Sequence, residues 1–127
     1  MTAREVIRSF REAYPSSLGE DTLVLWISEL EGMILSEIVM THEGGEAGAS
    51  APAVITLTSG ADGELTAKEP YARVYFDYLR MRCDEAHADS ARYSDSSALF
   101  ASSYADFADS YNRNHMPRTR AAELKTK

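Results

Sequence analysis

The chain of 127 residues is poor in residue types that define whole classes of protein. Cys83 is its single cysteine, which excludes an internal disulfide framework and any metal site built from several cysteines. No apolar stretch approaches the roughly 18 residues that a membrane-spanning helix needs. The first ten residues carry three charges and no apolar run, so we expect no secretory signal and a soluble, intracellular chain.

Basic residues are also scarce, and they are unevenly distributed. Lys and Arg number 13 against 20 Asp and Glu, and the formal charge is −7. Residues 113–127 hold five basic residues and one acidic residue, a charge of +4, which leaves 8 basic and 19 acidic residues and a charge of −11 in residues 1–112. Such a body repels a phosphate backbone, whereas the basic tail attracts one only weakly. The length and the 44% hydrophobic content predict one domain with a modest core.

Two amphipathic helices are predicted in the first third of the chain. Thr2 and Glu5 have the spacing of a capping box, and apolar residues then recur every three or four positions until Pro15 stops the helix after Tyr14. Residues 17–20 repeat the capping pattern. The stripe that follows predicts a second helix to about residue 40, and it consists of Leu23, Ile27, Leu30, Ile34 and Ile38.

The helical period disappears between Thr41 and Glu69, a segment that contains six glycines and prolines. Residues 54–58 are rich in β-branched side chains and residues 59–63 have turn chemistry, so a β-hairpin returning through residues 64–66 is plausible. Long loops in compact domains are either functional or disordered. A projecting arm that becomes ordered against a partner and a flexible insertion remain equal alternatives.

Two further helices are predicted between Pro70 and an end near Asn112 or Asn114. Pro70 fits the first turn of the third helix, and apolar residues continue along one face to about residue 86. The fourth helix has a heptad seam, which consists of Tyr93, Ser97, Phe100, Tyr104, Phe107 and Tyr111. Several N-cap residues between positions 87 and 96 leave its start open. The sequence thus predicts an all-α bundle of four helices in residues 1–113, with a long loop or hairpin arm at 41–69 and an extended basic tail at 114–127.

Candidate catalytic groups are few and far apart. His42, His87 and His115 lack the spacing that places two imidazoles on one helix face. Cys83 borders an apolar stripe, so we interpret it as a buried packing residue rather than a nucleophile. The glycines at residues 44–48 follow a helix and precede no Gly-Lys-Ser or Gly-Lys-Thr, so they form no phosphate-binding loop. The sequence predicts no enzyme, no cofactor and no metal site.

Two acid and base pairs lie on the predicted third helix. Arg73 with Asp77, and Arg80 with Asp84, are four residues apart and are expected to form exposed ion pairs worth a few tenths of a kcal/mol each. Five of the seven tyrosines fall in the last two helices, where their rings suit half-buried positions. These residues are typical of packing and solubility rather than of catalysis.

Several short segments contain characteristic patterns of packing and capping residues. They are Tyr14-Pro15, Trp26 to Gly32, Pro70-Tyr71 with Tyr75, Tyr78-Leu79, Arg92-Tyr93, Ser97 to Phe100, and Tyr111 to Pro117. In these segments the chain resembles the small head-to-tail connector proteins (neck adaptor or head completion proteins) of tailed bacteriophages and prophages of Gram-positive bacteria. The resemblance covers most of the chain outside residues 41–69 and departs from the family at residues 87–89 and 94–95.

The resemblance implies a structural virion protein. Connectors of this family are all-helical, dock under the portal protein at the unique capsid vertex, form a ring that is commonly dodecameric, and receive the stopper or tail. The DNA passes through the ring without sequence-specific binding, and an acidic body suits a channel that does not grip phosphates. The implied location is the virion neck, reached from the host cytoplasm during assembly, and no membrane is involved.

By the same analogy, the arm and the tail are the parts that reach neighbouring subunits or the portal. The arm could add a strand to an exposed sheet edge of a partner. The candidate partner-binding residues are Val54, Ile55, Leu57, Arg113, His115, Met116, Pro117, Arg118 and Arg120. The alternative to a connector is a small acidic helical protein that regulates or binds another protein or a nucleic acid.

Overall fold

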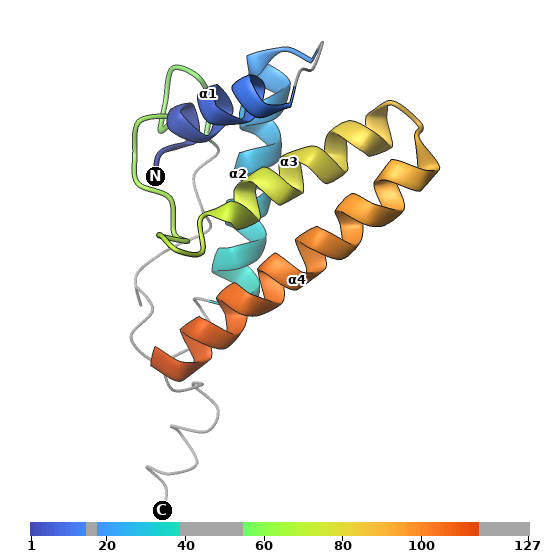
Figure 1. Cartoon of the computed structure of the whole chain (residues 1–127). Helices are drawn as coiled ribbons and strands as arrows, with labels where there is room; N and C mark the ends of the chain where they lie inside the picture. The colour runs from blue at the N-terminus through green and yellow to red at the C-terminus, as the bar shows by residue number, and fades with distance from the viewer. Residues whose placement is uncertain (15–17, 39–54, 115–127) are drawn as a thin grey trace, which may run out of the picture.

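Four helices make up most of the described part of the chain, which comprises residues 1–14, 18–38 and 55–114 of a computed structural model. The helices are α1 (Ala3–Ala13), α2 (Glu20–Glu37), α3 (Arg73–Ala86) and α4 (Ser90–Asn114) (Figure 1). They hold 72% of the described residues, which form no strand. The predicted all-α bundle is confirmed.

α1 begins as the sequence predicts. The Thr2 side chain accepts a hydrogen bond from the backbone N–H of Glu5, and the Glu5 carboxylate accepts one from the backbone N–H of Thr2. Two donors that a helix start leaves unpaired are thereby satisfied. The helix ends at Ala13, and Tyr14 is its C-cap. Its buried face, Ala3, Val6, Ile7 and Phe10, is the predicted apolar stripe.

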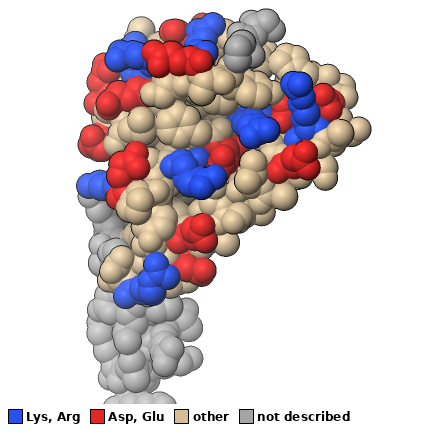
Figure 2. Space-filling view, in the orientation of Figure 1, with Lys and Arg blue, Asp and Glu red and all other residues tan. Residues whose placement is uncertain are grey.

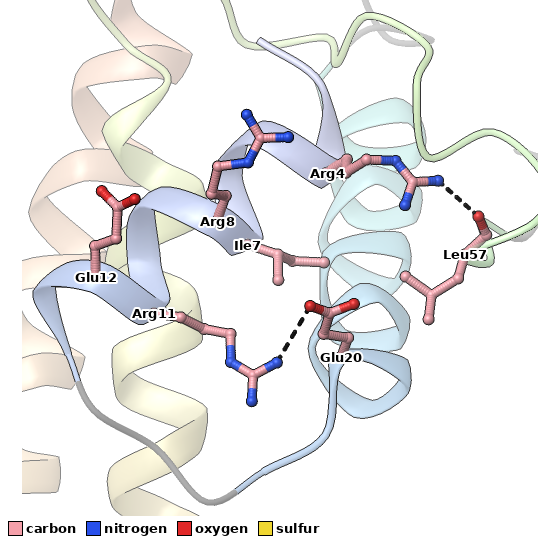
Figure 3. A pocket seen from close by; sticks show the side chains of 7 residues that line it. All are labelled: Arg4, Ile7, Arg8, Arg11, Glu12, Glu20 and Leu57. Carbon is pink, nitrogen blue, oxygen red and sulfur yellow. Dashed lines mark hydrogen bonds and ion pairs between the residues drawn. The ribbon is translucent and has the colours of Figure 1, made fainter.

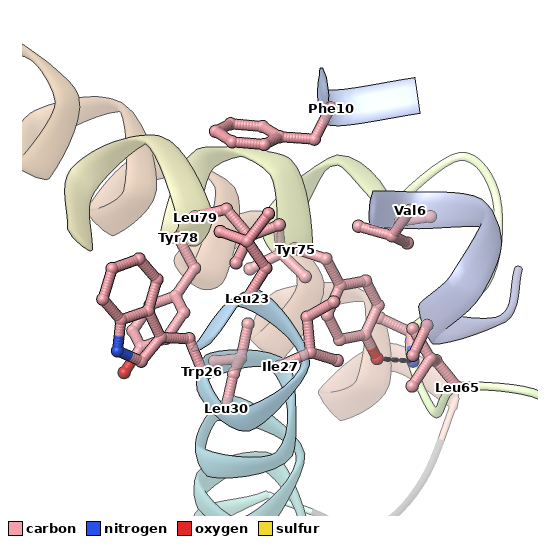
Figure 4. Packing of buried hydrophobic residues seen from close by; sticks show 14 of the residues in the cluster. Val6, Phe10, Leu23, Trp26, Ile27, Leu30, Leu65, Tyr75, Tyr78 and Leu79 are labelled. Atoms are coloured by element: carbon pink, nitrogen blue, oxygen red, sulfur yellow. Dashed lines mark hydrogen bonds between the residues drawn. The ribbon is translucent and has the colours of Figure 1, made fainter. Parts of the chain in front are cut away.

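α2 contributes more buried hydrophobic residues to the core than any other described helix. Its predicted stripe is buried throughout: Leu23, Ile27, Leu30 and Ile34 are fully buried, and Ile38 is 4% exposed. These side chains meet Val6 and Phe10 of α1, Tyr75 and Leu79 of α3, and Leu65 (Figure 4). The helix begins after Gly19 without a side-chain cap, and the predicted capping residue Ser17 lies outside the described residues.

α3 and α4 form an antiparallel hairpin joined by residues 87–89. α3 starts at Arg73, three residues after the predicted start at Pro70. α4 starts after Asp89, whose carboxylate accepts from the backbone N–H of Arg92, and it ends at Asn114 as predicted. Asp89 is therefore the N-cap that the sequence left open. α1 packs against α2 and α3, and α4 packs against α3 (Figure 1).

The buried face of α4 differs from the predicted aromatic seam. Its buried residues are Ser96, Ser103, Phe107 and Ser110, whereas the remaining seam residues, Tyr93, Ser97, Phe100, Tyr104 and Tyr111, are half-buried at the flank. The small serines occupy the positions next to α3, and the larger rings lie at the edges of this contact, where the Tyr104 hydroxyl donates to Glu37 of α2. Only Phe107 of the predicted aromatic residues points fully into the core.

The described end of the predicted arm packs on the body and forms no hairpin. Glu64 pairs with Thr2 rather than with the described residues 55–58, and the backbone N–H groups of Arg4 and Leu65 donate to the carbonyls of Ala61 and Met1. Burial of Leu65 and Ala67 in the core explains the difference, because it holds residues 61–67 against α1 and α2. The rest of the arm, up to Val54, lies outside the described residues.

None of the helices in the described part of the chain combines the length and the apolar character that a membrane crossing would require.

Candidate functional site

One candidate site is an open cleft of about 570 Å³ beside α1. It lies between α1, the first turn of α2 and the loop at Leu57 (Figure 3). Its lining combines three arginines, two glutamates and two aliphatic side chains: Arg4, Arg8, Arg11, Glu12, Glu20, Ile7 and Leu57. All three arginines belong to α1. Spacings of four and three residues place them on neighbouring positions of one face of the helix.

Contacts within the body hold Arg4 and Arg11 in place. Arg4 Nε lies 2.8 Å from Asp62 Oδ1, and Arg4 Nη2 donates to the carbonyl of Leu57 at 2.8 Å. The hydrogen bond to Asp62, together with its negative charge, raises the pKa of Arg4 above its usual value. Arg11 Nη1 lies 3.3 Å from Glu20 Oε1. These pairs fix the two ends of the arginine row.

Arg8 lies between them and is exposed. Within the described residues, the Arg8 side chain makes no hydrogen bond or ion pair, so its guanidinium is available to a ligand. A guanidinium binds carboxylate or phosphate through two parallel hydrogen bonds. Ile7 and Leu57 give the cleft an apolar floor, which suits a ligand that carries carboxylates on a partly apolar surface.

A second group of polar side chains fastens the helices to one another. Glu31 of α2 is 8% exposed and accepts hydrogen bonds from the Tyr75 hydroxyl and from the backbone and side chain of Thr66. The Tyr75 oxygen in turn accepts from the backbone N–H of Ala67 at 2.9 Å. Burial and the neighbouring Glu31 carboxylate raise the pKa of Tyr75 far above its usual value. The Tyr75 hydroxyl therefore keeps its proton, and its hydrogen bonds join α3 to α2 and to residues 65–67.

Asp84 of α3 is the most deeply buried carboxylate among the described residues, with 1% exposure. It accepts from the Tyr14 hydroxyl and from Ser96 Oγ, the latter at 2.8 Å. The prediction of an exposed Arg80–Asp84 pair is therefore wrong, because Tyr14 and α4 enclose the carboxylate. The predicted Arg73–Asp77 pair is formed, with Arg73 Nε 3.3 Å from Asp77 Oδ2, and Asp77 also accepts from Ser103.

Arg82 joins α3 to α2 at the surface. Its Nη1 lies 2.6 Å from Glu29 Oε2, and its guanidinium carbon lies 4.9 Å from the centre of the Trp26 ring. A guanidinium over an indole face adds a cation–π contact to the ion pair. Cys83 next to it is buried, as predicted. These contacts fasten α3 to α2.

Three of the predicted partner-binding residues are described, and they lie in two places, Ile55 and Leu57 in the loop before α3 and Arg113 at the end of α4. Leu57 lines the α1 cleft, and Ile55 is half-buried with its backbone N–H bonded to Ser28 Oγ at 2.9 Å. Arg113 is exposed at the end of α4, where it contacts the Tyr71 hydroxyl at 3.4 Å. The others lie outside the described residues: Val54, His115, Met116, Pro117, Arg118 and Arg120.

Sequence reasoning missed the arginines of the cleft. The signal was present, because residues 4, 8 and 11 share a face of a correctly predicted helix. Their significance depends on Leu57, Asp62 and α2, which only the fold brings beside them. The described residues contain no cluster of three or more histidine, cysteine, aspartate or glutamate side chains that could hold a metal ion.

Comparison of the chain with models of protein families, with curated proteins and with solved structures found no match.

Proposed function

We propose that this chain is a structural virion protein, a head-to-tail connector that docks on the portal of a tailed phage or prophage, forms a ring and joins the DNA-filled head to the stopper or tail. The resemblance in the segments from Tyr14-Pro15 to Tyr111–Pro117 suggested this role. The observation that carries it in the fold is the use of polar side chains. Glu29, Glu31, Asp77 and Asp84 each contact a side chain of another helix, which favours a rigid building block.

Several residues in the segments that carry the resemblance stabilise the fold. Trp26, Tyr75, Tyr78 and Leu79 belong to the core, and Tyr14 bonds to the buried Asp84. A connector needs such a body because it must keep its shape between a portal and a tail. The part of the resemblance that runs from Tyr14 to Leu79 thus includes residues that hold α1, α2 and α3 together.

The charge distribution also supports a role around DNA without tight binding to it. Residues 1–112 carry a charge of −11. Acidic and basic side chains alternate over the face shown in Figure 2, and no broad basic surface covers the described residues on that face. Such a surface repels phosphates on average, which allows DNA to pass through a ring.

Deletion of the gene from the parent phage or prophage tests the proposal. Electron microscopy of the lysate should then show DNA-filled heads and finished tails that are not joined, and a plasmid copy of the gene should restore complete particles. Normal infectious particles without the gene would overturn the connector role. Loss of all heads or all tails, together with a gel shift at physiological salt, would instead favour the small regulatory protein.

A further inference from the structure

The arginine row of α1 is an unusual feature of an otherwise acidic body. Arg4, Arg8 and Arg11 line one side of a cleft of about 570 Å³, and Arg8 is exposed without an ion pair in the described part of the chain (Figure 3). Arg4 and Arg11 are held by Asp62 and Glu20, so the row keeps its geometry. A cleft that is already shaped and contains one free guanidinium is suited to a carboxylate-bearing surface.

The chain itself presents such a surface on the outer face of α4. One stripe of this helix, spaced alternately by four and three residues, is exposed along its whole length and has only short side chains: Ala91, Asp95, Ala98, Ser102, Ala105, Asp109 and Asn112. The opposite stripe, at Ser96, Ser103 and Ser110, packs against α3. Short side chains allow another molecule to approach the helix closely, as the serines do on the inner face.

Carboxylates at one end of this outer face match the arginine row in spacing. Asp106 and Asp109 are exposed and make no ion pair within the described residues. They are three residues apart, as are Arg8 and Arg11, and three residues correspond to about 4.5 Å along a helix axis. Two helices laid side by side can therefore bring the two pairs of opposite charges together.

We propose that the α1 cleft of one copy binds the outer face of α4 of a second copy, with Arg8 opposite Asp109 and Arg11 opposite Asp106. α1 packs on α2 and α3, and α4 packs on the other side of α3, so the two surfaces are separate on each copy. A contact between two different surfaces is heterologous and closes into a ring when the rotation permits. The inference rests on the proposed connector function and names the subunit contact of its ring.

Charge reversal tests the contact in the purified full-length chain. Sedimentation velocity at low salt, at concentrations up to about 1 mM, should detect self-association of the wild type. Arg8→Glu and Asp109→Arg should each weaken it at least about 10-fold, because each places like charges in contact. The double variant Arg8→Glu/Asp109→Arg should restore it, since the pair is then re-formed with exchanged signs.

Matched controls separate this contact from a general charge effect. Lys68→Glu and Glu69→Lys change exposed charges outside both surfaces and should leave self-association unchanged. Circular dichroism and the urea midpoint should be the same for all five variants. A wild type that stays monomeric at about 1 mM overturns the proposal, and so does self-association that survives Arg8→Glu. A double variant as weak as the single ones also overturns it, and would assign the cleft to a different acidic partner.

The same variants in the phage distinguish this inference from the connector function. If deletion of the gene leaves heads and tails unjoined while Arg8→Glu particles are complete, the subunit contact is wrong and the connector role stands. If Arg8→Glu particles are unjoined and the double variant restores them, both are supported. Normal particles after deletion overturn the connector role whatever the self-association of the purified chain.

Discussion

α3 packs against α1, α2 and α4, and its contacts with α2 and with α4 are built differently. Toward α2, the core contains aliphatic side chains that are completely buried, among them Leu23, Ile27, Leu30 and Ile34. Toward α4, the buried side chains are three serines and Phe107, and two of the serines donate hydrogen bonds to carboxylates of α3. The contact between α2 and α3 relies on buried apolar area, and the contact between α3 and α4 relies on small side chains and hydrogen bonds.

This difference predicts how stability is distributed in the molecule. A buried Leu or Ile contributes roughly 1.5 to 3 kcal/mol, whereas a typical hydrogen bond contributes a net of about 1 kcal/mol. α4 gains additional area from half-buried rings at its flank, such as Phe100, whose centre lies 5.0 Å from that of Tyr78. We therefore expect α2 and α3 to form the most stable unit and α4 to open at lower free energy.

The largest expected effect on stability comes from comparing a leucine of α2 with a leucine of α4. Leu30 on α2 is fully buried, and Leu99 on α4 is 39% exposed. Leu30→Ala should lower the free energy of unfolding by about 3 kcal/mol because it leaves a cavity, and Leu99→Ala by less than about 0.5 kcal/mol. Urea unfolding followed by circular dichroism measures both. Equal losses would mean that α4 is as deeply embedded as α2.

A smaller effect concerns the hydrogen bonds that hold α4. Asp84→Ala removes the acceptor of Tyr14 and Ser96, so we expect a loss of about 2 kcal/mol from two donors left without a partner. Amide exchange in α4 should accelerate more than in α2, which hydrogen exchange with mass spectrometry can resolve. The exposed Asp95 on α4 is the control, and Asp95→Ala should be neutral. An equally mild Asp84→Ala would contradict a structural role for this carboxylate.

The smallest effect is a difference in response to alkaline pH. Burial, together with Glu31, raises the pKa of Tyr75, and burial together with Glu37 raises that of Tyr104, which is less deeply buried. Above the usual tyrosine pKa of about 10, the unfolded chain loses these protons while the folded chain keeps them. The contribution of these tyrosines to the free energy of unfolding should therefore be constant below about pH 9 and fall above about pH 10, by about 1 kcal/mol for Tyr75 at pH 11.

Two phenylalanine variants assign that loss to one contact or the other. Urea titrations at about pH 8, 10 and 11 should show that Tyr75→Phe flattens the alkaline fall more than Tyr104→Phe does. The slope, rather than the stability at neutral pH, is the quantity to compare, because Tyr75→Phe also removes hydrogen bonds to Glu31 and Ala67. A steeper fall in Tyr75→Phe would reverse the sign and contradict the buried phenol.

The predicted helices agree with the structure where the signal is local. The capping box at Thr2 depends on residues three apart, and the α2 stripe depends on helical period, so both can be seen in the sequence. The hairpin at 54–66 was expected from β-branched residues and turn chemistry. It is not formed among the described residues, because Leu65 and Ala67 are buried against α1 and α2, and Glu64 pairs with Thr2.

The candidate site was less predictable than the fold. The row of arginines on α1 follows from the spacing of residues 4, 8 and 11, but the cleft also needs Leu57 and Glu20 from elsewhere in the chain. Asp84 had the spacing of a surface ion pair with Arg80, and only the approach of Tyr14 and Ser96 made it a buried acceptor. Spacing along a helix identifies a face, while the neighbours of that face decide its role.

By itself, the sequence determined that this protein is a bundle of helices, because capping residues and apolar period act within one or two helical turns. The tertiary structure decided which stripe of α4 is buried. The aromatic seam has the stronger apolar pattern, yet serines at 96, 103 and 110 occupy the inner position. The reason is that Ser96 and Ser103 donate hydrogen bonds to carboxylates of α3, which favours small hydroxyl side chains over aromatic rings at this contact.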